Sequence, residues 1–182
     1  MAAVPSIQEL LRSCDHSAIH LEMRDGYDRD DPMFLAWQEG RGDDPNLDHS
    51  SWWRPWLDVV ADVTGRGVRI QRARIISEPV SEYIRFEYDG TFTNVAAGEE
   101  IRWLPRREAT DIALPGNDFW VFDEERVRIG HFDGDGKSTE HEMTDDPAVL
   151  KLCLSAFEAV WNRAIPHERF QPRVKGSAAP GR

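Results

Sequence analysis

The chain has 182 residues, of which 40% are hydrophobic and 10% aromatic, and it carries a formal net charge of −11. This length suits one packed domain, and the negative charge disfavours a broad nucleic-acid surface. The sequence has no apolar run long enough to span a membrane and no secretory signal at its start, so we expect a cytoplasmic protein. Cys14 and Cys153 are too few for a disulfide framework or a four-ligand zinc site.

Helices and strands are predicted to alternate in the first half of the chain. Ser6 and Glu9 form a capping box that begins a helix, and Asp31 followed by Pro32 begins a second helix, which Gly40 ends. The spacing of apolar and β-branched residues predicts the other elements. In chain order, we expect a helix over 7–13, a strand over 17–23, a helix over 32–39, a polar loop over 41–50, a helix over 52–64, a strand over 68–76 and a helix over 80–94.

The second half is predicted to hold mainly strands and one long helix. We expect a strand over 100–104, an irregular segment over 105–116, and strands over 119–122, 127–132 and 137–143. Asp145, Asp146 and Pro147 are expected to cap a final helix over 148–164. These elements predict a single α+β domain over 1–172, with an antiparallel or mixed sheet, a C-terminal hairpin, and N-terminal, central and C-terminal helices packed on it. Residues 173–182 are predicted to form a mobile tail.

His131 and His141 flank the turn of the predicted hairpin, and its register decides whether they share a face. A loop of two or four residues would place them on opposite faces. We prefer a three-residue loop, which pairs Ile129 with His141 and Val127 with Met143, because it collects apolar residues on one face. The histidines would then be diagonal neighbours on an apolar face, which favours packed neutral rings over a metal site. No zinc-ligand spacing occurs, and we expect no metal and no cofactor.

Arginines recur along the strand predicted over 68–76. Alternation places Arg72 and Arg74 on its mostly apolar face, where an arginine is costly unless it is paired. One interpretation is a buried ion-pair network with the acids that are near in sequence. These are Glu78, Glu82 and Glu87. The other interpretation is a binding site for a carboxylate or phosphate anion.

The anion-binding interpretation predicts a small-molecule enzyme or sensor. Its pocket would lie between the central sheet and the helix over 80–94, where a general acid–base role for Glu87 would require a perturbed pKa. The candidate ligand-binding residues are Arg72, Arg74, Tyr83, Arg85, Glu87 and Asp118.

An acidic segment and a tryptophan cluster indicate a surface for a partner protein. Nine acidic residues and three arginines lie between Glu22 and Asp48. Such a segment is either neutralised within the molecule or meets a basic partner. Core packing explains clustered tryptophans, but an exposed one could anchor a partner. The candidate partner surface comprises Trp52, Trp53, Trp56, Asp43 and Asp44.

Short segments spread along nearly the whole chain carry a family resemblance. They are SAIHLEMRDGY at 17–27, EPVSEYIRFE at 78–87, NVAAGEEI at 94–101, DFWVFD at 118–123, and the end of the chain over 144–170. In this order they resemble an uncharacterised actinobacterial family of domains of unknown function. Its members are often encoded beside Cro/repressor-type helix-turn-helix regulators, and residues 119–161 resemble the C-terminal domain of such regulators. The family supplies no catalytic residues, and the segment 54–56 is richer in tryptophan than the family pattern.

We therefore expect a non-enzymatic regulatory or interaction module that acts with a helix-turn-helix regulator. The sequence has no nucleophile elbow, phosphate-binding loop or dinucleotide fingerprint. The net charge disfavours direct DNA binding through the arginines over 66–74. The alternative is the anionic-ligand enzyme or sensor described above. The sequence leaves a homodimer open.

Overall fold

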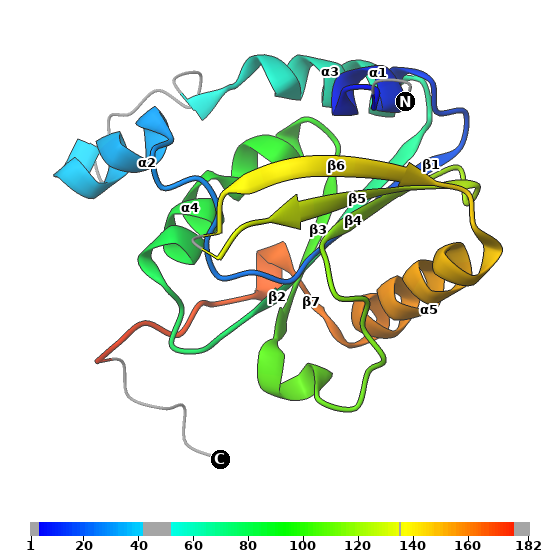
Figure 1. Ribbon diagram of the computed structural model, residues 1–182. Coiled ribbons are helices and arrows are strands. Elements are labelled where there is room, and N and C mark those ends of the chain that lie inside the picture. Colours follow the sequence, from blue (N-terminus) through cyan, green and yellow to red (C-terminus); the bar gives the residue numbers. More distant parts are fainter. Residues whose placement is uncertain (1–3, 42–51, 135, 177–182) are drawn as a thin grey trace.

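The computed structural model describes residues 4–41, 52–134 and 136–176. Within these residues, a seven-stranded mixed sheet runs through the middle of the protein in the order β6-β5-β4-β1-β2-β3-β7 (Figure 1). The strands are β1 (Ser17–Glu22), β2 (Arg69–Ile76), β3 (Glu100–Pro105), β4 (Phe119–Phe122), β5 (Arg126–Phe132), β6 (Ser138–Thr144) and β7 (Ile165–Pro166). β1, β2 and β3 are parallel, and the other neighbours pair antiparallel. The expected α+β fold with a mixed sheet is confirmed.

Helices cover both faces of this sheet. They are α1 (Ile7–Arg12), α2 (Pro32–Ala36), α3 (Pro55–Gly65), α4 (Glu82–Ala96) and α5 (Pro147–Arg163), with the shorter turns η1 (Trp37–Arg41), η3 (Arg106–Ala109) and η4 (His167–Arg169). α1, α3 and α4 pack on one face and α5 packs on the other, so each face has its own apolar core (Figure 1). Within the described part of the chain, none of the helices combines the length and the apolar character that a membrane span requires.

The two parallel crossovers bring α3 and α4 over the same face of the sheet. Parallel neighbours need a long connection, which α3 supplies between β1 and β2 and α4 supplies between β2 and β3. Leu57 and Val60 of α3 pack in one core with Ile70 of β2. Ile84 of α4 packs in another core with Trp103 of β3. The candidate site lies on this face, between the two helices.

Local sequence signals begin two of the helices as expected. Ser6 and Glu9 make both hydrogen bonds of a capping box at the start of α1. Asp146 accepts the N–H of Ala148 at 2.7 Å at the start of α5. Each cap satisfies backbone donors that the first turn of a helix leaves free, so these ends depend on neighbouring residues alone.

Two predicted helices differ from the observed ones. α3 begins at Pro55 and not at Trp52, because Arg54 precedes a proline and takes extended backbone angles of φ −97° and ψ 149°. The helix predicted over 32–39 gives way after Ala36 to η1, a π-helical turn that contains Gly40 with φ of 80°.

The hairpin of β5 and β6 has the expected loop, but the predicted register is wrong. Gly136 takes the left-handed conformation, with φ of 88°. A bulge then skips Thr139, so that His141 pairs with Gly130 and not with Ile129. His131 and His141 consequently lie on opposite faces of the sheet and are not diagonal neighbours.

The two apolar residues that favoured the predicted register also lie on different faces. Val127 packs in the core beneath α5, whereas Met143 packs against the core beneath α1 and α3. The prediction assumed that the hairpin has one apolar face. Because helices bury both faces of the sheet, an apolar residue can point to either of them.

The chain after η4 stays attached to the fold as far as Val174. Phe170 is buried and stacks on Trp103, with ring centroids 5.5 Å apart. The carbonyl of Arg173 accepts the N–H of Val80 at 2.8 Å, and Val174 packs against the same core. Residues 177–182 of the predicted tail lie outside the described residues.

Candidate functional site

A row of polar and aromatic side chains crosses the sheet face beneath α3 and α4. His20 of β1 lies opposite Arg72 of β2 and opposite Trp120 of β4, which in turn lies opposite Arg128 of β5. The imidazole of His20 stacks on the indole of Trp120. Residues at opposite positions on neighbouring strands point to the same side, so these four side chains lie on the same face of the sheet.

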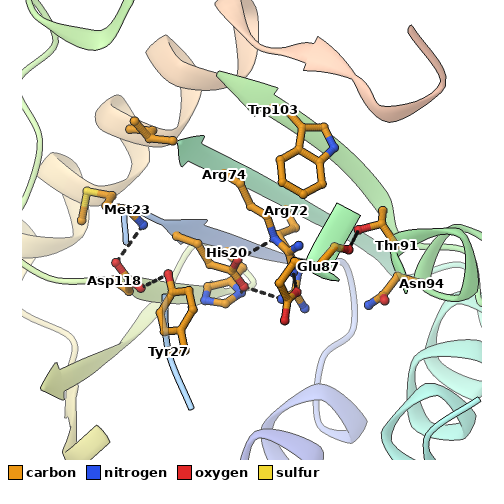
Figure 2. Close-up of polar contacts among 12 residues, drawn as sticks. His20, Met23, Tyr27, Arg72, Arg74, Glu87, Thr91, Asn94, Trp103 and Asp118 are labelled. Atoms are coloured by element: carbon orange, nitrogen blue, oxygen red, sulfur yellow. Dashed lines mark hydrogen bonds and ion pairs between the residues drawn. The ribbon is translucent and has the colours of Figure 1, made fainter. Parts of the chain in front are cut away.

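The two arginines of β2 belong to a buried ion-pair network (Figure 2). The Nε of Arg72 donates to Glu99 at 2.7 Å, and its Nη1 pairs with Glu22. The Nε of Arg74 lies 2.6 Å from Glu22, and its Nη2 lies 2.6 Å from Glu87. One carboxylate therefore bridges two guanidinium groups on the same face of β2.

The partners of these arginines differ from the expected acids, except for Glu87. Glu78 pairs with Arg107 at 3.6 Å, and Glu82 accepts a hydrogen bond from Gln38 at 3.4 Å. Glu22 takes the central place because β1 runs parallel to β2 and brings it opposite Arg74. Nearness in sequence was therefore a poor guide to the partners.

The ion pairs keep the central groups charged, while burial keeps His20 neutral. Burial raises the pKa of Glu22, but Arg74 and Arg72 outweigh it and hold that pKa below its ordinary value. Burial, aided by the charges of Arg72, Arg74 and Arg128, lowers the pKa of His20 well below its ordinary value. A neutral imidazole thus sits among three guanidinium groups.

A cavity of about 740 Å³ opens over this part of the sheet. It is lined by His20, Glu22, Tyr27, Trp52, Arg54, Trp56, Arg72, Arg74, Tyr83, Phe86, Glu87, Asn94, Asp118, Trp120, Arg128, Phe132, Lys137 and His141, among other residues. Ligand sites of proteins commonly have this volume and this mixture of aromatic and polar walls.

Two guanidinium nitrogens in this cavity have neither a hydrogen bond nor an ion pair with a described residue. The side chain of Arg74 is 5% exposed, and its Nη1 is buried without a hydrogen bond. The Nε of Arg128 is likewise buried without one, and Arg128 forms no ion pair with a described residue. Burial alone lowers the pKa of Arg128. Unsatisfied donors of this kind are costly, and a ligand that accepts from them is one way to remove the cost.

Asp118 ties the segment after β1 to the start of β4, beside the cavity (Figure 2). It accepts the N–H of Met23 at 2.9 Å and the O–H of Tyr27 at 2.5 Å. Burial raises the pKa of Asp118 to about 6, and the charge of Glu22 adds to the rise although the bond from Tyr27 opposes it. The position of Tyr27 over the cavity therefore depends on a carboxyl group that titrates near neutral pH.

The structure brings most of the candidate ligand-binding residues together. Those that line the cavity are Arg72, Arg74, Tyr83, Glu87 and Asp118. Arg85 does not: its guanidinium is 47% exposed, lies over the ring of Trp37 and is 4.0 Å from Asp89. Arg85 is two residues from Glu87 on α4, and residues at that spacing do not share a helix face.

The sequence did not point to several cavity residues, among them His20, Glu22 and Arg128. In the sequence, His20 and Glu22 are the polar positions of the strand predicted over 17–23, where they alternate with apolar residues. Their alternation was a usable signal, because both faces of this sheet are buried and a polar stripe on an inner strand then has to face a cavity or an ion-pair network.

The candidate partner surface is divided by the fold. Trp52 and Trp56 line the cavity, and Trp52 packs against Phe86 with ring centroids 6.1 Å apart. Trp53 is 36% exposed, and its Nε1 donates to Asp58 at 2.8 Å. Asp43 and Asp44 lie outside the described residues.

The hairpin histidines have separate surroundings. His141 lines the cavity, whereas the Nε2 of His131 lies 3.2 Å from Glu142 on the other face. In the described ranges, no group of three or more His, Cys, Asp or Glu side chains is placed to hold a metal ion.

Comparison with known families assigns the chain to one of them. A family model described as a domain of unknown function, DUF6879, matches residues 5–172. The chain belongs to this family. The DUF6879 match agrees with the resemblance to a family of unknown function, while the actinobacterial origin and the neighbouring regulators stay predictions. No curated protein sequence matches the chain.

Two solved structures share the fold of this DUF6879 chain. A phospholipase D family member, Nuc from Salmonella typhimurium, has a TM-score of 0.51 and 11% identity, over 87% of this chain and 86% of that chain. NucT from Helicobacter pylori has a TM-score of 0.50 and 12% identity, over 87% of both chains. The TM-scores indicate a common fold. Because the identities are so low, no site residue is transferred from these structures to this chain.

Proposed function

We propose that the chain is a binding module for a small anionic molecule, which it holds in the cavity between the sheet and α4. The observation that carries this proposal is the pair of unsatisfied guanidinium donors, on Arg74 and Arg128, in one cavity. A ligand that places an acceptor at each of them would remove the cost of leaving them without partners. Hydrogen bonds between two charged groups are also about twice as strong as neutral ones.

The guanidinium of Arg128, which no described carboxylate pairs, favours an anion over a cation. Arg72 and Arg74 are matched by Glu22, Glu87 and Glu99, whereas Arg128 has no carboxylate partner among the described residues. Because His20 is neutral, it adds no charge to either side. The guanidinium of Arg128 is therefore available to a ligand.

The ion pairs also orient the proposed binding groups. Glu22 and Glu87 hold the Nε and Nη2 of Arg74, so that its Nη1 is the donor left for a ligand. A guanidinium fixed in this way loses little rotational freedom on binding, which favours affinity. His20 stacks on Trp120 and keeps the indole flat beside the cavity.

Binding is a better description of this site than covalent chemistry by a cysteine. Burial raises the pKa of Cys14 to about 12 and that of Cys153 to about 11, so neither thiol is a ready nucleophile. The expected partner, a helix-turn-helix regulator, remains a prediction that fits a ligand sensor. Affinity purification of the full chain from its native host tests it, and recovery of no regulator would count against it.

The test of the proposal is calorimetric titration of the full chain with anions at low ionic strength. The probes are inorganic phosphate, pyrophosphate, dicarboxylates and mononucleotides. We expect at least one of these probes to bind, and we expect Arg128→Ala to weaken its binding about 10-fold or more. Arg126→Ala is the matched control, since Arg126 lies on the same strand and face but outside the cavity. Binding by no probe, or equal losses in both variants, would overturn the proposal.

A further inference from the structure

We infer that the bound anion carries a planar aromatic ring and is about the size of a mononucleotide. This inference rests on the proposed function and adds to it the chemistry of the rest of the ligand. It is carried by three features of the cavity: its volume, the aromatic rings on two sides of the guanidinium groups, and the balance of acids and bases along its walls.

The volume is too large for a simple inorganic anion. The cavity measures about 740 Å³, and protein sites of roughly 300–1,000 Å³ enclose most of the surface of a drug-sized molecule. A phosphate or carboxylate group at Arg128 would leave most of this space to the remainder of the ligand. That remainder has to match the walls on either side of Arg74 and Arg128.

Aromatic rings form the wall on the side toward α3. Trp56 is half-buried and stands edge-on to Trp120, with ring centroids 6.3 Å apart and planes at 73°. The guanidinium of Arg72 lies 5.8 Å from the centroid of Trp56 and 5.6 Å from that of Trp120. Trp56 thus lines the cavity without being enclosed by the core, which leaves part of its ring for contact with a ligand.

Aromatic rings also form the wall on the side toward the hairpin. Tyr27 and Phe132 are both half-buried and line the cavity, with ring centroids 5.8 Å apart. The ring centroid of Tyr83, on α4, lies 6.0 Å from that of Tyr27. Stacking on such rings stabilises a bound planar ring and tolerates different ring chemistries.

The charges along the walls favour one anionic group over several. The basic lining residues are Arg29, Arg54, Arg72, Arg74, Arg128 and Lys137, and the acidic ones are Glu22, Asp28, Asp30, Glu87 and Asp118. Because these nearly balance, a polyphosphate would bring additional negative charges close to carboxylates. A single anionic group at Arg128 avoids this repulsion.

The experiment compares ligands that differ in one part at a time. The full chain is titrated with inorganic phosphate, adenosine, AMP, ATP and indole-3-acetate, the last being an aromatic carboxylate. We expect AMP or the aromatic carboxylate to bind at least about 10-fold more tightly than phosphate, adenosine or ATP. Whichever of the two is preferred identifies the anionic group as phosphate or carboxylate.

Variants separate the ring from the anion. Trp56→Leu should weaken binding of the ring-bearing anion about 10-fold and leave phosphate binding unchanged. Arg128→Ala should weaken the binding of both ligands. Trp53→Leu is the matched control, because Trp53 lies outside the cavity. If Trp56→Leu fails to fold, as judged by circular dichroism, Phe132→Leu applies the same test to the other wall.

The outcomes distinguish this inference from the proposed function. Phosphate that binds as tightly as every ring-bearing anion would overturn the inference and leave the anion site intact. If ATP binds more tightly than AMP, the inference that the ligand has a single anionic group is wrong. Binding by no anion would overturn the inference and the proposed function together.

Discussion

His20 lies flat against Trp120, with ring centroids 4.1 Å apart and ring planes 16° apart. The two residues are direct cross-strand neighbours on β1 and β4. Their contact forms the floor of the cavity, between the guanidinium groups of Arg72 on one side and Arg128 on the other. A charged imidazole at this place would meet like charges, so the stack depends on His20 staying neutral.

The protonation of His20 gives the first prediction. Burial and three arginines hold its pKa well below the ordinary value of 6.5. Below pH 6.5 the unfolded chain therefore binds a proton at His20 that the native protein does not bind, and the native state loses stability as the pH falls. We expect the imidazole NMR signals of His20 to stay those of a neutral ring at pH 6. A titration midpoint at or above 6.5 would contradict the structure.

Asp118 should show the opposite dependence on pH. Its folded pKa is raised from 3.8 to about 6, so the native state binds the proton more tightly than the unfolded state. The stability that this proton contributes is present below pH 3.8 and is lost as the pH rises through 6, a change on the order of 3 kcal/mol. Urea unfolding between pH 4 and 7 measures it. Asp118→Asn should abolish this slope, and an unchanged slope would disprove the assignment.

Glu22 should be the most sensitive acid of the ion-pair network. Glu22→Gln removes the carboxylate that both buried arginines share, and loss of one partner from a buried pair costs about 3–5 kcal/mol. Chemical denaturation measures the loss.

The control for Glu22→Gln is a pair on the surface. Asp111 pairs with Arg163 but is 72% exposed, so we expect Asp111→Asn to change the denaturation midpoint little. Similar effects of the two variants would mean that Glu22 is solvated.

Gly98 is a position where only glycine fits the turn between α4 and β3. It has φ of +95°, and a Cβ there would lie 2.6 Å from the Oγ1 of Thr64. That hydroxyl donates to the carbonyl of Ala97 at 2.7 Å and has little freedom to move. Gly98→Ala should therefore destabilise the protein by about 2 kcal/mol, measured by thermal unfolding.

The matched control for Gly98→Ala is Gly65→Ala. Gly65 ends α3, and a Cβ there would meet no atom within 4 Å. Alanine is the better helix former, so this variant should be neutral or slightly stabilising. Equal destabilisation by both changes would show that crowding at Thr64 is not the cause.

The sequence by itself determined the features that depend on neighbouring residues. The capping box at Ser6, the cap at Asp146 and the left-handed Gly136 all involve groups a few positions apart, so the pattern specifies the geometry. The α+β class and the placement of Arg72 and Arg74 on one face followed from hydrophobic periodicity in the same way.

Only the tertiary structure decided which residues meet across the sheet. The bulge at Thr139 turned His141 toward the cavity, and the parallel pairing of β1 with β2 made Glu22 the shared partner of the arginines in place of Glu78 and Glu82. Contacts between distant segments depend on strand order and register, which change a side chain's face with a shift of one residue. No local pattern encodes that shift, which places His141 on the wall of the cavity.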